Sequence, residues 1–321
     1  MQYLVLVPDT LNQAGLAALR SVTAFEVHAP GKMTREQTLA RIPEAHALIV
    51  RSDTKVDAAL LEHADQLRVV VRAGVGVDNI DLEMCTARGI VVMNTPEANT
   101  ISTAEHTIAL MFALARHIPQ ADRSLREGRW ERSKFVGTQL TGKTLGIIGY
   151  GRIGHAVAER AKALGMTVLP YDPFTPERLA RRLAMLTDPD QVFAQADVLS
   201  LHALVTDETR EIINRETIAR MKDGVLIVNT ARGALIHNAD LAEALRSGKV
   251  AGAALDVYDP EPPAPDHPLL GLPNVVHTPH LAASTHEAQS QVGVEAAEAV
   301  RKALLEGRYD NVRNREVLGM G

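Results

Sequence analysis

The chain has 321 residues, 46% of them apolar, which is enough for about two domains with real hydrophobic cores. The net charge is −5 and the pI about 6.2, so we expect no basic surface for nucleic acid. A single cysteine, Cys85, excludes an internal disulfide and is typical of the reducing cytoplasm. No apolar run is long enough for a signal peptide or a membrane span, so we expect a soluble protein without a membrane partner.

Short apolar runs alternate with helical patterns over residues 1 to about 95. Strands are predicted at 3–7, 46–50, 67–72 and 90–93, and helices at 11–20, 34–40, 57–64 and 81–87. Such alternation requires crossover connections, which produce a parallel sheet covered by helices. This part of the chain therefore predicts one small α/β domain.

A break in this alternation comes at Asn94-Thr95-Pro96, because proline and the residue before it disfavour helix. A long helix follows, with Ser102 and Glu105 in a capping-box pattern. Its predicted apolar face consists of Ile101, Ala104, Ile108, Met111, Phe112 and Ala115. We interpret this helix as the link into a second domain, with a hinge near residues 95–100.

Residues 119–143 combine a charged helical stretch with a segment of little periodicity. They contain the only tryptophan, Trp130, which is interpreted either as a half-buried surface anchor or as a contact with a second subunit. The run from Gly137 to Thr144 also matches the phosphate-loop pattern G-x-x-x-x-G-K-T. A strand follows this match where a phosphate loop needs a helix, so nucleotide hydrolysis is not expected.

Six apolar runs follow, most of them separated by helical segments. They lie at 145–148, 166–169, 198–201, 225–228, 253–257 and 275–276. This pattern is typical of a doubly wound, six-stranded nucleotide-binding sheet. A last long helix is predicted from about residue 284 to 306.

The first of these runs passes into Gly149-x-Gly151-x-x-Gly154 and then directly into a helix. The first glycine permits a tight turn, the second lets the backbone approach a pyrophosphate, and the third lets helix and strand pack closely. The N-terminus of the helix also attracts phosphate. Asp172, 18 residues after Gly154, can accept both ribose hydroxyls and would repel the 2′-phosphate of NADP. The motif therefore predicts a site for NAD.

Arg232, Glu261 and His280 follow the fourth, fifth and sixth runs, and ligands bind outside the carboxyl ends of strands in such sheets. Arginine offers a fork for a carboxylate, and histidine exchanges a proton near neutral pH. A glutamate can orient the imidazole and raise its pKa. His277 competes with His280, but it falls within the predicted strand and His280 lies past its end. The pair has no acidic companion in the sequence, and we expect no metal site.

Together these motifs resemble the D-isomer-specific 2-hydroxyacid dehydrogenase family. The residues that carry the resemblance are Arg72 to Asn79, Asn94-Thr95-Pro96, Trp130-Glu131-Arg132, Gly149 to Gly154, Asn229 to Gly233, Ala254 to Val257, Glu261-Pro262-Pro263 and Pro279-His280-Leu281. Within the family, the chain most resembles the branch that oxidises 3-phospho-D-glycerate in serine biosynthesis. It ends at Gly321, so a short form is expected, without the C-terminal regulatory domains of longer members.

The resemblance implies NAD-dependent oxidation of a D-2-hydroxy acid. It implies Arg232, Glu261 and His280 as catalytic residues, with His280 as the acid/base paired with Glu261. The implied cofactor contacts are Gly149, Gly151, Arg152, Ile153, Gly154, Asp172, Thr230, Ala231, Asp256, Ala282 and Ala283. The expected substrate contacts are Arg51, Arg72, Gly74, Val75, Gly76, Arg232 and His280. The candidate phosphate ligands are Arg51, Arg72, Arg132 and Lys134.

The implied fold has two Rossmann-like or flavodoxin-like doubly wound parallel-sheet domains, with the nucleotide-binding domain inserted into the substrate domain. Residues 1–97 and 285–321 would form the substrate-binding domain, and residues 98–284 the NAD-binding Rossmann domain. Family members form homodimers through the inserted domain, which favours the subunit contact for Trp130. Two alternatives stay open: a glyoxylate or hydroxypyruvate reductase of the same family, and a non-enzymatic NADH-binding scaffold.

Overall fold

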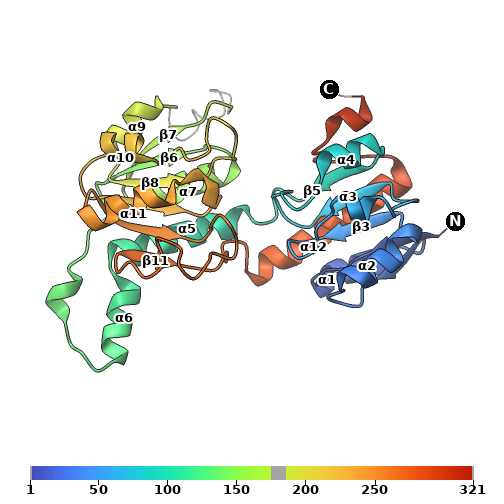
Figure 1. Cartoon of the computed structure of the whole chain (residues 1–321), viewed down its shortest axis with the longest axis horizontal. Coiled ribbons are helices and arrows are strands. Elements are labelled where there is room, and N and C mark those ends of the chain that lie inside the picture. The colour runs from blue at the N-terminus through green and yellow to red at the C-terminus, as the bar shows by residue number, and fades with distance from the viewer. Residues whose placement is uncertain (1, 175–185, 320–321) are drawn as a thin grey trace. The chain divides into compact units, whose positions relative to one another are not determined.

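The computed structural model describes residues 2–174 and 186–319, which form two compact α/β units. The first unit comprises residues 1–99 and 284–321, and the second comprises residues 100–283. Each unit has its own parallel sheet with helices on both faces (Figure 1). Within the described residues, no helix combines the length and apolarity needed to cross a lipid bilayer.

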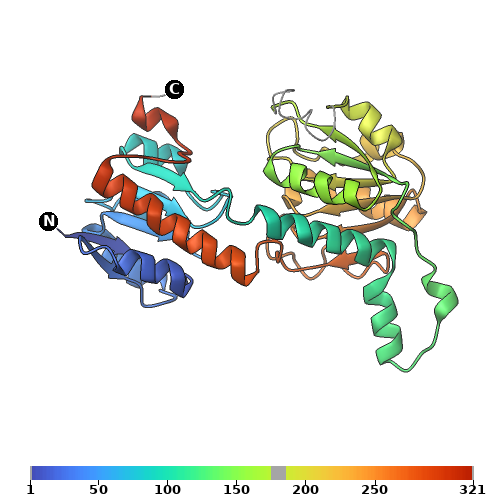
Figure 2. The same ribbon diagram turned by 180° about the vertical axis from the view of Figure 1, so that it is seen from behind.

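A five-stranded parallel sheet forms the centre of the first unit, in the order β2-β1-β3-β4-β5. Its strands are β1 (Tyr3–Leu6), β2 (Phe25–His28), β3 (Ala47–Val50), β4 (Val69–Arg72) and β5 (Val91–Asn94). Its helices are α1 (Gln13–Arg20), α2 (Arg35–Arg41), α3 (Ala58–Leu61), α4 (Leu82–Ala87) and α12 (His286–Arg301), with short turns at Ile42–Glu44, Lys302–Glu306 and Arg315–Leu318. Helices α1 and α12 pack on one face, and α3 and α4 on the other (Figure 2). Helix α12, from the C-terminal part of the chain, therefore packs in the same core as β1 and α1 from its N-terminal part.

Four of these five strands were predicted from the sequence and are confirmed, but β2 was missed. It is an edge strand of four residues, of which only Phe25 is buried. Edge strands contact the core less than interior strands do, so β2 lacks the continuous apolar run that identifies β3 and β4.

The second unit has a six-stranded parallel sheet in the order β11-β10-β9-β8-β6-β7. Its strands are β6 (Thr144–Ile148), β7 (Thr167–Tyr171), β8 (Val198–Leu201), β9 (Val225–Asn229), β10 (Val250–Leu255) and β11 (Val275–His277). Helices α5 (Thr100–Ala115) and α7 (Arg152–Ala163) cover one face, and α9 (Pro189–Gln195), α10 (Arg215–Arg220) and α11 (Asn238–Ser247) cover the other. All six predicted strands are confirmed. The strand order reverses between β6 and β8, and ligands of such sheets bind at that switch point.

Helix α5 corrects two details of the sequence analysis. It begins at Thr100, so the predicted capping box at Ser102 is wrong. The predicted apolar face is partly wrong as well, because Ile101 is 53% exposed while Thr103 and Thr107 are buried. The hydroxyl of Thr107 donates to the carbonyl oxygen of Thr103 at 2.8 Å. Threonines whose hydroxyls are satisfied in this way can enter a core, so polarity alone misplaced the buried face.

Helix α6 (Ile118–Arg126) and the 3-10 turn Arg132–Phe135 stand away from the sheet of the second unit in both views (Figures 1 and 2). Trp130 lies between them and is 77% exposed, and Leu125 and Val136 are exposed as well. Its interpretation as a half-buried surface anchor is therefore wrong. The subunit contact stays a prediction.

Candidate active site

The candidate acid/base pair, His280 and Glu261, forms at the carboxyl edge of the second unit's sheet. Nδ1 of His280 lies 2.8 Å from Oε2 of Glu261, and Oε1 of Glu261 accepts a hydrogen bond of 2.9 Å from the backbone N–H of Tyr258. The hydrogen bond to Glu261 raises the pKa of His280, although burial opposes this rise. Burial acts to raise the pKa of Glu261, but the hydrogen bonds from His280 and Tyr258 lower it on balance.

The second nitrogen of this ring, Nε2, is available for chemistry. The His280 side chain is 52% exposed, and its Nε2 has no hydrogen-bond partner among the described residues. With Nδ1 held by a carboxylate, the ring can gain or lose a proton at Nε2.

His277 is the last residue of β11, which confirms that it lies within the strand. Its Nδ1 lies 3.1 Å from the hydroxyl of Tyr258, and burial lowers the pKa of His277. Burial also raises the pKa of Tyr258 to about 12, so this hydroxyl stays protonated. No group of three or more His, Cys, Asp or Glu side chains suited to hold a metal ion occurs in the described part of the chain.

The loop with Arg232 follows β9 and is held by Asn229, which is fully buried. The Asn229 amide nitrogen donates to the carbonyl oxygen of Arg232 at 2.8 Å, and its amide oxygen accepts from the N–H of Ala231 at 3.0 Å. A side chain at Gly233 would overlap the backbone of Tyr258, so this loop packs directly against the loop that leads to Glu261. The positive charge of Arg232 adds to the lowering of the pKa of Glu261 and partly opposes the rise in the pKa of His280.

Asp256 follows β10 and is completely buried. Its Oδ1 accepts hydrogen bonds from Thr278 Oγ1 at 2.6 Å and from the N–H of Leu281 at 2.7 Å, and its Oδ2 accepts from the N–H of Ala282 at 2.9 Å. Burial acts to raise the pKa of Asp256, but these hydrogen bonds and one from His106 hold it below its usual value. The resemblance implied a cofactor contact here. In this conformation Asp256 is 0% exposed, and the contact stays a prediction.

The glycine turn after β6 distinguishes its three glycines. Gly149 has φ +95, and a side chain there would overlap the backbone of His202 and Ala203. A side chain at Gly154 would overlap the carbonyl group of Gly149. Gly151 has φ −72, and no atom lies within 4 Å of the place of a Cβ. The protein's own packing therefore requires the first and third glycines, and the space beside the second is open.

That open space faces the N-terminus of α7. Gly151 is the N-cap residue of this helix, and no side chain caps its first N–H groups, which include those of Arg152 and Ile153. A pyrophosphate would find there both room and the positive end of a helix. The residues of the turn thus fit a dinucleotide.

Asp172 follows β7 and spans the glycine turn. Its Oδ2 accepts from the N–H of Tyr150 at 2.7 Å, and its Oδ1 accepts from the N–H of Phe174 at 2.8 Å. A carboxylate can accept hydrogen bonds from several donors at once, as recognition of a ribose requires. The remaining predicted cofactor residues lie on loops at the same edge: Thr230 and Ala231 after β9, and Ala282 and Ala283 after β11.

Arg51, predicted to bind substrate, lies at the carboxyl edge of the first unit's own sheet, just after β3. Its backbone N–H donates to Asp9 Oδ2 at 2.5 Å, and its carbonyl oxygen accepts from the amide of Asn79 at 2.7 Å. These contacts fix the backbone of Arg51, and the residue as a whole is half-exposed.

Arg72 and the 74–76 turn lie at the same edge of the first unit, at the end of β4. Arg72 packs over Gly74, which has φ +147 and where a side chain would overlap the guanidinium. The carbonyl oxygen of Val75 accepts a hydrogen bond of 2.5 Å from the amide of Asn94 at the end of β5. The predicted site residues of the first unit thus lie together at the carboxyl edge of its sheet. Those of the second unit lie together at the carboxyl edge of the other sheet.

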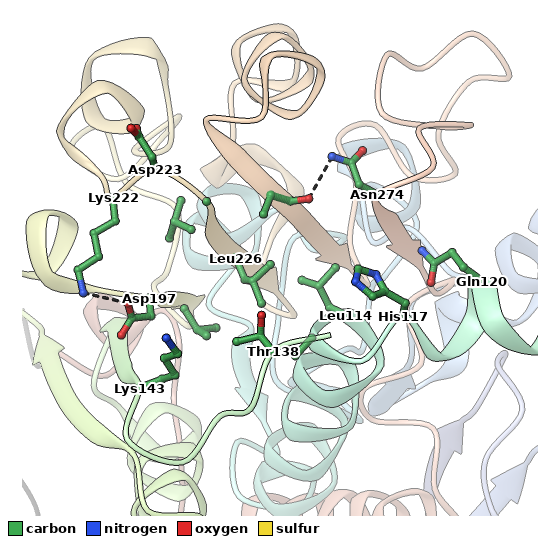
Figure 3. Close-up of a pocket in the computed structure, with 15 residues that line it drawn as sticks. Leu114, His117, Gln120, Thr138, Lys143, Asp197, Lys222, Asp223, Leu226 and Asn274 are labelled. Carbon is green, nitrogen blue, oxygen red and sulfur yellow. Dashed lines mark hydrogen bonds and ion pairs between the residues drawn. The ribbon is translucent and has the colours of Figure 1, made fainter. Parts of the chain in front are cut away.

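A cavity of about 260 Å³ lies at the opposite, amino-terminal edge of the second unit's sheet (Figure 3). Asp197, Lys222 and Asn274 line it, and the Lys222 amine pairs with Asp197 at 2.9 Å (Figure 3). None of the predicted site residues lines this cavity. The chemistry-bearing residues lie at the other ends of the same strands, so the cavity is separate from the candidate active site.

Three residues that contact the loops of the candidate active site were not predicted from the sequence: His106, Thr107 and Thr278. Nε2 of His106 lies 3.2 Å from Oγ1 of Thr278, and Oγ1 of Thr107 lies 2.8 Å from Oγ1 of Thr230. The available signal was the polar pair His106-Thr107, which falls between the apolar positions Ala104 and Ile108 of α5.

Comparisons with known proteins identify the family. Its sequence profile, described as D-isomer specific 2-hydroxyacid dehydrogenase, NAD binding domain, matches residues 108–282. The chain is 52% identical over 297 residues to the D-3-phosphoglycerate dehydrogenase of Archaeoglobus fulgidus, covering 92% of this chain and 56% of that protein. The enzyme of the same name from Methanocaldococcus jannaschii is 48% identical over 312 residues, covering 97% of this chain and 59% of that protein. The chain thus spans little more than half the length of these curated relatives.

A solved structure gives the same result over its full length. The glyoxylate reductase from Paecilomyes thermophila superposes with a TM-score of 0.88 at 32% identity, covering 98% of this chain and 99% of that one. Profile, sequence and structure all indicate the same family. The chain therefore belongs to the D-isomer specific 2-hydroxyacid dehydrogenase family, and its second unit contains the NAD-binding domain of that family.

Proposed function

We propose that the protein is an NAD-dependent D-2-hydroxyacid dehydrogenase that oxidises 3-phospho-D-glycerate to 3-phosphohydroxypyruvate in serine biosynthesis. The observation that carries the proposal is the 2.8 Å contact between His280 Nδ1 and the Glu261 carboxylate, at the sheet edge that also holds the glycine turn. The names of the relatives at 52% and 48% identity support the choice of substrate.

His280 is the proposed acid/base. Because Glu261 holds Nδ1, Nε2 is the atom that removes the proton of the C2 hydroxyl, and the Glu261 carboxylate stabilises the imidazolium that results. NAD, when bound, accepts the hydride from C2 as the C2–O bond becomes a carbonyl. In the reverse direction the same Nε2 returns the proton to the oxygen.

Arg232 is the proposed ligand of the substrate carboxylate in the second unit, since a guanidinium binds a carboxylate through two parallel hydrogen bonds. The first unit is the proposed substrate-binding domain, with Arg51, Arg72 and the backbone of residues 74–76 as ligands. Two half-exposed arginines at one sheet edge support binding of a phosphate as well as a carboxylate.

A glyoxylate or hydroxypyruvate reductase is the second candidate, and the structural similarity to a glyoxylate reductase favours it. The two candidates differ in the phosphate group of the substrate. The test measures kcat/KM with NADH for 3-phosphohydroxypyruvate, hydroxypyruvate and glyoxylate, together with oxidation of 3-phospho-D-glycerate.

The expected preference for the phosphorylated keto acid is about 100-fold, because arginines that bind a phosphate are left unpaired by a substrate without one. A higher kcat/KM for glyoxylate would refute the proposed substrate. NADH binding without turnover on any keto acid would instead indicate the non-enzymatic scaffold.

A homodimer through the second unit is also proposed. Trp130, Leu125 and Val136 are exposed apolar side chains on or beside the segment that stands away from the sheet, and such residues are enriched at interfaces. The Trp130→Glu variant should have half the wild-type mass by light scattering.

A cytoplasmic location is proposed from the composition, whose only cysteine, Cys85, is free and buried.

A further inference from the structure

We infer that two consecutive residues of α5, His106 and Thr107, are positioning residues. They hold the loops of His280 and Arg232 at a fixed distance and orientation relative to each other. His106 acts on the His280 loop through Asp256 and Thr278. Thr107 acts on the Arg232 loop through Thr230. Neither residue belongs to the proposed catalytic group.

The conformation of His280 needs outside support. His280 has φ 54, a left-handed conformation that is uncommon for a residue with a side chain and persists only where the surroundings impose it. Its backbone N–H donates to the carbonyl oxygen of Asp256 at 2.8 Å. The next two N–H groups, of Leu281 and Ala282, donate to the Asp256 carboxylate at 2.7 and 2.9 Å. One aspartate thus anchors three consecutive residues of the turn.

The Asp256 carboxylate in turn depends on its side-chain partners. It is 0% exposed, so each oxygen needs donors from the protein. Nε2 of His106 lies 3.3 Å from Asp256 Oδ1 and 3.2 Å from Thr278 Oγ1, and Thr278 donates to the same Oδ1 at 2.6 Å. His106 is the contact that connects this cluster to α5. Without it, the carboxylate loses a donor and the turn loses its link to the helix.

Thr107 makes the second connection from the adjacent position. Its hydroxyl donates to the carbonyl oxygen of Thr103 at 2.8 Å, so its oxygen accepts the hydroxyl hydrogen of Thr230 across a distance of 2.8 Å. Both threonines are buried, at 0% and 6% exposure. Thr230 comes two residues before Arg232, so α5 holds the arginine loop as well.

One rigid helix therefore connects the loop of the acid/base to the loop of the carboxylate ligand. Their separation matters because a displacement of about 1 Å of reacting groups can lower a rate by about 100-fold. The arrangement also explains why an apolar helix carries a histidine and a threonine on its buried side.

The test measures the pKa of His280 by NMR in the full chain with 13C-labelled histidine, using His280→Ala for assignment. The groups that face His280 are Glu261, Asp256 and Arg232. In His106→Leu the turn relaxes away from Glu261, so the pKa of His280 should fall towards its ordinary value of 6.5. In His106→Gln an amide N–H replaces the imidazole donor, and the wild-type pKa should return. Turnover should fall about tenfold in the leucine variant and less than threefold in the glutamine variant.

A matched control lies one residue earlier on α5. The Glu105 side chain is 64% exposed and faces Arg160 at 3.6 Å, so Glu105→Gln should change neither quantity. An unchanged His280 pKa in His106→Leu, or equal damage in His106→Gln, would overturn the role of His106. If His106→Leu does not fold, Thr278→Val and Thr278→Ser provide the same comparison from the other side of Asp256, with the same two outcomes.

Thr107 is tested by a different pair of variants, compared by their kinetic constants. Thr107→Val removes the hydroxyl without changing shape, and should raise KM for the hydroxy acid about fivefold through Arg232, a larger change than its effect on kcat. Thr107→Ser should restore KM, and an unchanged KM in Thr107→Val, or equal damage in Thr107→Ser, would overturn the assignment.

The kinetic readouts rest on the proposed function, but the NMR readout does not. A wild-type protein without turnover would refute the proposed function. The His280 pKa would still decide the role of His106.

Discussion

The two units arrange their strands alike but finish their first strand-to-helix turns differently. Five strands follow the same order in both sheets, β2-β1-β3-β4-β5 in the first unit and β7-β6-β8-β9-β10 in the second. In the first unit, the side chain of Asn12 caps α1 by accepting from the N–H of Ala14 at 2.9 Å. In the second unit, α7 begins at Arg152, and its N-cap residue, Gly151, provides no side-chain cap.

This difference separates a structural turn from a binding turn. A capped helix satisfies its own donors, and an uncapped glycine end leaves donors and space for a ligand. The sheet order is shared, so it says nothing about which unit binds the dinucleotide. That information lies in a few residues at the edge of the sheet.

The largest expected effect concerns the chemistry at the second unit's edge. His280→Ala should lower kcat by about 10²–10⁴-fold, because Nε2 is the proposed proton acceptor. The affinity for NADH, measured by fluorescence, should stay near that of the wild type, since the glycine turn is intact. Wild-type turnover in this variant would contradict the assignment of His280.

A side chain at Gly151 that caps α7 should make the glycine turn of the second unit resemble the capped turn before α1 in the first unit. Gly151 has φ −72 and ψ −160 with free space beside it, so Gly151→Asn is tolerated by the backbone and can cap α7. NADH should bind about 100-fold more weakly by fluorescence titration, while the melting temperature stays equal or rises. Unaltered NADH affinity would show that the dinucleotide does not approach Gly151.

Glu261→Gln tests the electrostatics of the acid/base. The Glu261 carboxylate raises the pKa of His280 above its ordinary 6.5, so keto acid reduction, which needs imidazolium, should be constant below that pKa and fall as pH rises through it. Oxidation, which needs neutral imidazole, should change in the opposite direction. In Glu261→Gln both transitions should move to lower pH, so reduction at pH 8 should fall more than reduction at pH 6.

A matched control for this variant is Asp259→Asn, which removes a carboxylate from the same loop. Its side chain is 54% exposed, so the pH profile should stay that of the wild type. Identical shifts in both variants would show that the effect is general charge and not the contact with His280.

The smallest expected effect lies in the first unit's turn. Asn12→Ala should lower the free energy of unfolding by about 1 kcal/mol, measured by urea denaturation, because α1 loses its cap. The affinity for NADH should not change. A weakened NADH affinity would show that the first unit's turn takes part in cofactor binding and would end the contrast between the two turns.

The glycine turn, the six strands of the second unit and the grouping of Arg232, Glu261 and His280 at one edge were all readable from the sequence. Each depends on a short pattern, an apolar run followed by a particular residue type, and parallel strands bring such strand ends together. The edge strand β2 was not readable, because its exposed positions erase the apolar run.

The chain alone thus specifies the class of fold, the cofactor turn and the residue types of the chemistry, because these follow from local periodicity and from what each residue type can do. The hydrogen bonds that anchor the turn of His280, Leu281 and Ala282 could be identified only from the tertiary structure. His106 and Thr278 are 172 positions apart and meet on a buried carboxylate because α5 packs beside β11. No local pattern records a hydrogen bond between distant residues, since packing alone decides which buried polar groups face one another.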